Sequence, residues 1–182
     1  MNRRKANDFI LLTCAVRSNR KAIGRLRQVA LDTVKTMEVE VNHQQLEIAF
    51  NEALTNALIY GNLKIPGDLR ESKGDDAFWE MVKRREQDES FNTREITLRM
   101  ECHEDRLVLT VRDEGDGFDW KGLVSSMDGA RDETAGPDTL ASHGRGLLIL
   151  RNYVDDLQWN EKGNEVSFAM KLSPREEAAG GF

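Results

Sequence analysis

Hydrophobic positions recur along this chain with two periods, one typical of strands and one typical of helices. Residues 9–16 form an apolar run rich in strand formers, which predicts a first strand. Residues 18–37 repeat apolar side chains at helical spacing, with Ser18 as the expected N-cap. A second helical repeat begins after Asn42, its expected N-cap, and ends at Gly61. The first third of the chain is therefore predicted to be a strand followed by two long amphipathic helices.

The rest of the chain is predicted to be mainly sheet. Residues 95–102 and 107–111 alternate apolar and polar side chains over part of their length, as in a half-buried antiparallel sheet. Residues 119–143 are a mixed segment, and residues 144–155 show a helical pattern that begins at glycines. A final hairpin is predicted from its two strand patterns, at 157–160 and 165–172. This order of elements predicts a two-layer α/β sandwich, in which helices cover one face of a mixed, mostly antiparallel sheet.

A single domain is expected to span residues 1–182, because the length lies within the usual range for one domain. The polar interval 63–93 has too few apolar residues for a core of its own, so we interpret it as an excursion from that domain. The tail at 174–182 is expected to be loose.

Composition and charge limit the partners. The formal net charge is −6, so the chain as a whole lacks the basic character of a nucleic-acid-binding protein. The apolar run 9–16 is far shorter than the ~20 residues that span a bilayer, and Arg17 follows it at once. Neither a membrane span nor a targeting segment is expected. We therefore expect a cytoplasmic protein with no direct nucleic-acid or membrane partner.

The second helix carries a polar pair within the run NEALTNALIYGN, where Glu52 and Asn56 lie one turn apart on the same face. An Asn amide oxygen is a neutral, hard ligand that suits Mg²⁺, which also takes oxygens from nucleotide phosphates. A carboxylate one turn away can accept a proton from an attacking hydroxyl. Two ordinary solvent-facing side chains would give the same pattern, so this pair alone does not decide the function.

An Asp/Gly-rich stretch, DEGDGFD, follows the strand predicted at 107–111. Asp113 can accept a hydrogen bond from an exocyclic amino group, and glycines at 115 and 117 allow the backbone to approach a ring closely. A calcium-binding EF-hand loop is excluded, because Gly115, Phe118 and Val124 occupy its third, sixth and twelfth positions. A plain hairpin turn stays an alternative.

The third motif, SHGRGL at 142–147, opens the last predicted helix. Gly144 and Gly146 would expose backbone N–H groups at the positive end of the helix dipole, which favours phosphate. The Rossmann GxGxxG pattern is not met, and no Walker A sequence occurs.

In order and spacing, these motifs resemble the N, G1 and G2 boxes of the GHKL (Bergerat-fold) ATPases, over residues 8 to 172. The run GRGLLILRNYVDDLQWNEKGNEV looks most like the anti-sigma-factor serine/threonine kinase branch. The resemblance implies the Bergerat ATP-binding fold and the cofactors ATP and Mg²⁺. It further implies that Glu52 is the catalytic base, that Asn56 holds Mg²⁺ and that Asp113 recognises the adenine amino group. The remaining nucleotide contacts would be Gly115 and Gly117 at the base and Gly144, Arg145, Gly146 and Leu147 at the phosphates, beneath a lid at about 125–143.

The resemblance also implies a function. The protein would transfer the ATP γ-phosphate to Ser or Thr of an antagonist STAS-domain protein, and its other partner would be a sigma factor. One alternative is a non-catalytic sequestering module gated by nucleotide, although the intact Glu52 and Asn56 favour a kinase. Another is the catalytic half of a histidine kinase, which is disfavoured because a helix pair with an accepting His is lacking and the chain starts at Met1. Homodimerisation stays open.

Three features depart from the family pattern. Tyr60 stands where many members have His, and Asn164 stands where many have Thr. The excursion at 63–93 is longer than in the simplest anti-sigma kinases.

Overall fold

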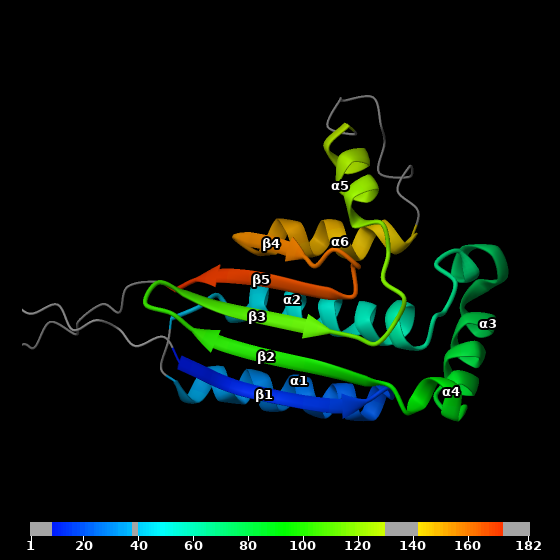
Figure 1. Ribbon diagram of the computed structural model, residues 1–182, viewed down its shortest axis with the longest axis horizontal. Coiled ribbons are helices and arrows are strands. Elements are labelled where there is room, and N and C mark those ends of the chain that lie inside the picture. Colours follow the sequence, from blue (N-terminus) through cyan, green and yellow to red (C-terminus); the bar gives the residue numbers. More distant parts are fainter. Residues whose placement is uncertain (1–8, 38–39, 130–141, 173–182) are drawn as a thin grey trace, which may run out of the picture.

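A five-stranded sheet forms one layer of the protein, with strands in the order β1-β2-β3-β5-β4 (Figure 1). The computed structural model describes residues 9–37, 40–129 and 142–172. Each of the four strand pairings is antiparallel. The strands are β1 (Phe9–Arg17), β2 (Glu95–Cys102), β3 (Arg106–Arg112), β4 (Asp156–Trp159) and β5 (Glu165–Lys171). The α/β sandwich predicted from the hydrophobic pattern is confirmed, and its described strands are antiparallel throughout.

The helices pack around the sheet, and three of them form the second layer (Figure 1). The helical elements are α1 (Arg20–Thr36), α2 (His43–Asn56), the π-helix η1 (Ala57–Asn62), α3 (Leu69–Arg85), α4 (Glu89–Asn92), α5 (Trp120–Gly129) and α6 (Ser142–Tyr153). Helices α1, α2 and α6 lie on one face of the sheet (Figure 1). The helical patterns at 18–37, 42–61 and 144–155 correspond to these elements, whereas α5 lies in a segment for which no helix was predicted. No helix among the described residues is both long and apolar enough to cross a bilayer.

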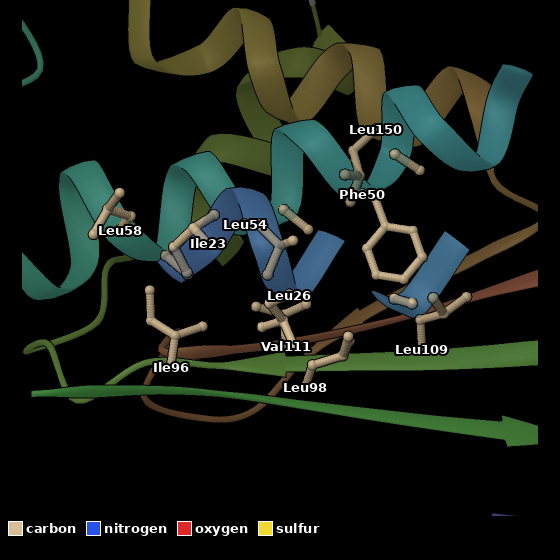
Figure 2. Packing of buried hydrophobic residues seen from close by; sticks show 14 of the residues in the cluster. Ile23, Leu26, Phe50, Leu54, Leu58, Ile96, Leu98, Leu109, Val111 and Leu150 are labelled. Carbon is tan, nitrogen blue, oxygen red and sulfur yellow. The ribbon is translucent and has the colours of Figure 1, made fainter. Parts of the chain in front are cut away.

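The core lies between the helices and the sheet. Figure 2 shows Leu26 of α1 and Leu54 of α2 above Leu98 and Val111 of the sheet, all buried. The alternation of buried and more exposed residues along β2 and β3 matches the predicted period of two. Because one face of α2 is locked into this core, the orientation of its polar face is fixed as well.

The first helix begins one residue later than predicted. Asn19 is the N-cap, and its side-chain oxygen accepts a hydrogen bond from the backbone N–H of Ala22 at 2.8 Å. The Ser18 hydroxyl instead donates to the carbonyl of Arg94 and accepts from the Asn62 amide, and Ser18 is fully buried. The prediction of Ser18 as N-cap was wrong because a tertiary contact uses its hydroxyl. Asn42 does cap α2, as predicted.

The excursion at 63–93 contains α3 and α4, which lie beyond one end of the sheet (Figure 1). Gly74 interrupts α3 with a φ of 83°. Phe78 and Val82 are buried in the same hydrophobic cluster as the helix–sheet core, so the excursion is packed onto that core. The predicted tail at 174–182 and most of the lid predicted at 125–143 lie outside the described residues.

Candidate functional site

The polar face of α2 meets the first turns of α6. A Cβ atom at position 146 would lie 2.7 Å from Oε2 of Glu52 and 3.4 Å from Nδ2 of Asn56. A larger residue at 146 would require the end of the Glu52 side chain to shift, so the backbone of α6 lies close to both side chains. The first and third sequence motifs therefore form one surface, although about 90 residues separate them in the chain.

Glu52 is partly removed from water at this surface. Burial raises the pKa of its carboxyl group, and a hydrogen bond with the Asn51 side chain opposes that rise. A carboxylate with a raised pKa is a better proton acceptor than an exposed one. The raised pKa agrees with the predicted role of Glu52 as a general base, and that role stays a prediction.

The helix that carries Glu52 changes character directly after Asn56. Residues 57–62 form a π-helix, a rare element that is often found at functional sites. Its wider turn places Gly61 against the second motif, where a Cβ atom at position 61 would lie 2.5 Å from Cγ of Asp113. The end of the first motif thus contacts the start of the second.

Asp113 is buried at the end of β3. Its Oδ1 accepts a hydrogen bond from the backbone N–H of Gly115 at 2.7 Å. Burial raises the pKa of Asp113 to about 6, against the opposing effects of the Gly115 N–H and the charge of Lys162. A carboxylate held away from water favours a ligand that donates a hydrogen bond.

The described residues that line a cavity of about 420 Å³ include Asn56 and Asp113 but not Glu52 or Gly146. Asn56 lies on its wall with Leu147, and Asp113 lies on the wall with Gly117. Other lining residues were not singled out as ligand contacts from the sequence: Tyr60, Gly67, Asp68, Phe118, Trp159 and Asn164. Two of them, Tyr60 and Asn164, were noted from the sequence only as departures from the family pattern. Gly144 and Arg145 lie in the first turn of α6, and their contacts with a ligand stay a prediction.

Comparison with family models identifies a histidine kinase-like ATPase domain over residues 15–170. The chain belongs to this family. The GHKL assignment made from the order of the motifs is thereby confirmed. No curated protein matched the chain in a sequence search.

The residues of this GHKL domain fit an adenine nucleotide. The cavity has the size of typical small-molecule sites, which are roughly 300–1,000 Å³. At one end, the Asn56 side chain lines the cavity, and the Glu52 carboxylate lies beside it next to the backbone of Gly146. At the other end is the buried carboxyl of Asp113. Within the described residues, no group of three or more His, Cys, Asp or Glu side chains could hold a metal ion, so Mg²⁺ would depend on Asn56 and phosphate oxygens.

The glycines of the second motif are required by chain packing. A Cβ atom at position 115 would lie 2.6 Å from the carbonyl oxygen of Gly61, and one at position 117 would overlap the carbonyl of Lys162. Gly117 also has a φ of 78°, a conformation that other residues rarely adopt. These glycines therefore hold the Asp113 loop against its neighbours, and their contact with a base stays a prediction.

Replacing Gly117 by Ala is expected to lower the free energy of unfolding by about 1–2 kcal/mol, because the new methyl group meets backbone and the φ is unfavourable. Gly24→Ala is the matched control. Gly24 lies in α1 with open space around it, and alanine there should stabilise the protein by about 0.5–1 kcal/mol. Urea unfolding of the two variants measures both effects, and equal stabilities would contradict the packing described for Gly117.

Proposed function

We propose that this GHKL protein is a cytoplasmic serine/threonine kinase of the anti-sigma-factor type. It would transfer the ATP γ-phosphate to a STAS-domain antagonist and sequester a sigma factor. The resemblance of residues 144–166 to that branch supports the substrate class. The support for phosphoryl transfer comes from one contact, the packing of Gly146 against Glu52 and Asn56.

This contact supports catalysis because Glu52, the proposed catalytic base, and Asn56, the proposed Mg²⁺ ligand, would both lie beside phosphates bound at the start of α6. The acceptor hydroxyl oxygen attacks the γ-phosphorus, the bond from that phosphorus to the bridging oxygen of ADP breaks, and the hydroxyl proton passes to Glu52. Asn56 would hold Mg²⁺, which neutralises phosphate charge when it is bound. Asp113 binds the adenine at the other end of the nucleotide, and the apolar walls of the cavity exclude water around the adenine ring.

Replacing Asn56 by Ala is expected to abolish Mg²⁺-dependent ATP affinity and phosphate transfer together, because the variant lacks the proposed metal ligand. The assay incubates the protein with γ-labelled ATP, Mg²⁺ and purified STAS-domain proteins. Thr55→Ala, which truncates an exposed neighbour on α2, should behave as the wild type.

The stability of the transferred label distinguishes the functions. Phosphoserine and phosphothreonine survive acid, whereas phosphohistidine does not, so acid-labile label would indicate a histidine kinase. Tight ATP binding without transfer to any STAS-domain protein would overturn the kinase proposal and favour a sequestering module.

A further inference from the structure

The turn between β4 and β5, residues 160–164, is organised by one side chain. Oδ1 of Asn160 accepts hydrogen bonds from the backbone N–H groups of Gly163 at 2.7 Å and Asn164 at 3.1 Å. Its Nδ2 donates to Oδ1 of Asn164 at 2.9 Å. Both polar atoms of the Asn160 amide are thus used within the turn, which makes the turn a rigid unit.

One side of this turn holds the loop that contains Asp113. The Asn164 side chain donates to the carbonyl of Asp113 at 2.7 Å, and the N–H of Asp113 donates to the carbonyl of Asn164 at 2.9 Å. Nζ of Lys162 donates to the carbonyl of Gly115 at 2.8 Å. The backbone on both sides of the Asp113 carboxyl group is therefore fixed by residues of the turn.

The other side of the turn holds the first residue of α5. The indole N–H of Trp120 donates to the carbonyl of Asn160 at 2.9 Å. Its ring stacks on Trp159, with 5.6 Å between centroids and 24° between planes. Gly163 packs so closely on the backbone of Phe118 that no side chain would fit there. The start of α5 is thus attached to the same rigid unit as Asp113.

The Asp113 loop and the start of α5 border the same cavity. Asp113 and Asn164 line the 420 Å³ cavity, and so does Leu123 in the first turn of α5. A smaller hollow of about 170 Å³, lined by Trp120 and Leu123 among others, lies beside α5.

We propose that this turn couples recognition of the nucleotide base to the position of α5, with Asn160 and Trp120 as positioning residues. The proposal rests on the proposed function only in that the cavity must bind an adenine nucleotide. A nucleotide base that donates a hydrogen bond to Asp113 favours one position of the loop that contains Asp113. The position of that loop then determines the position of α5 through the hydrogen bonds of Asn164, Asn160 and Trp120. Because coupling is reciprocal, weakening the attachment of α5 also lowers the preference for that base.

The test compares ADP with IDP, which has the same phosphates but a carbonyl oxygen in place of the amino group. Hydrogen exchange of the α5 amides is measured with each nucleotide in the wild type, in Trp120→Phe and in Trp79→Phe. Phe at 120 keeps an aromatic ring but lacks the indole N–H. Trp79 is a partly exposed residue of α3, so its variant controls for the loss of a tryptophan.

In the wild type and in Trp79→Phe, ADP is expected to protect the α5 amides more than IDP does. In Trp120→Phe this difference should disappear, and the affinity ratio of ADP to IDP should fall roughly 3- to 10-fold, the factor expected for one neutral hydrogen bond. A merely structural role of Trp120 would lower stability but preserve the difference between the nucleotides.

Two results overturn the coupling alone: equal protection by ADP and IDP in the wild type, or a full ADP–IDP difference in Trp120→Phe. If calorimetry shows that the wild type binds neither nucleotide, the proposed function fails and the coupling fails with it.

Discussion

Glu52→Gln is expected to slow phosphate transfer by roughly 10²–10⁴-fold while changing ADP affinity little. Glutamine keeps the shape of the side chain and can still form hydrogen bonds, but it cannot take the proton of the acceptor hydroxyl. Asn56 and Asp113, the proposed contacts at the two ends of the nucleotide, remain unchanged. Because phosphoryl transfer depends largely on positioning and charge, the decrease is expected at the low end of this range.

Single-turnover transfer to the cognate antagonist measures this effect, with ADP affinity determined in parallel by calorimetry. Glu47→Gln, an exposed glutamate on the same helix, is the matched control and should transfer phosphate at the wild-type rate. If Glu52→Gln also transfers at that rate, Glu52 is not the base.

Asp113→Asn is expected to weaken ADP binding by about 1.5–3 kcal/mol, because a charge-assisted hydrogen bond becomes a neutral one. The wild type should also lose ADP affinity as the pH falls through about 6, where the carboxyl takes up a proton. The asparagine variant should lack that dependence. Asp116→Asn is the control, since Asp116 lies in the same loop but is exposed and paired with Lys64. Calorimetry that finds unchanged ADP affinity in Asp113→Asn would refute its assignment as the base-recognising residue.

The same substitution should stabilise the nucleotide-free protein. The pKa of Asp113 is raised to about 6 in the folded state, above the ~3.9 of an unfolded chain. Burial therefore favours the neutral carboxyl, and the corresponding stability is lost as the pH rises from about 4 to about 6. At pH 7.5 the asparagine avoids this cost, so its free energy of unfolding should exceed that of the wild type by up to about 3 kcal/mol. Urea unfolding at pH 7.5 and pH 4 measures the difference, which should vanish at the lower pH.

The spacing of hydrophobic residues was sufficient to predict most of the fold. The regular spacing of Leu26, Ala30 and Val34 predicted α1, and the alternation along β2 and β3 predicted their buried face. Helix α5 was not predicted, because its ten residues contain two glycines and contribute few side chains to the core. The cap of α1 was misplaced by one residue, since Ser18 and Asn19 are both good N-caps and only the contact with Asn62 distinguishes them.

Less of the candidate site than of the fold could be predicted from the sequence. The order of the three motifs was enough to identify the GHKL family, since each motif is local. The packing contacts of the glycines in these motifs could not be predicted from the sequence, because Gly61, Gly115 and Gly146 contact residues distant in the chain. The contributions of Tyr60, Trp159 and Asn164 to the cavity also depend on packing between separate elements.

The sequence by itself determined most of the elements, the family and the chemical types of the proposed nucleotide contacts, because these depend on periodicity and on short motifs. The tertiary structure alone decided which side chains meet. It brought Glu52 and Asn56 against Gly146, and it buried Asp113 deeply enough to raise its pKa. It also attached Asp113 and Trp120 to a common turn. These properties arise from desolvation and from contacts between segments far apart in the chain, which no local pattern encodes.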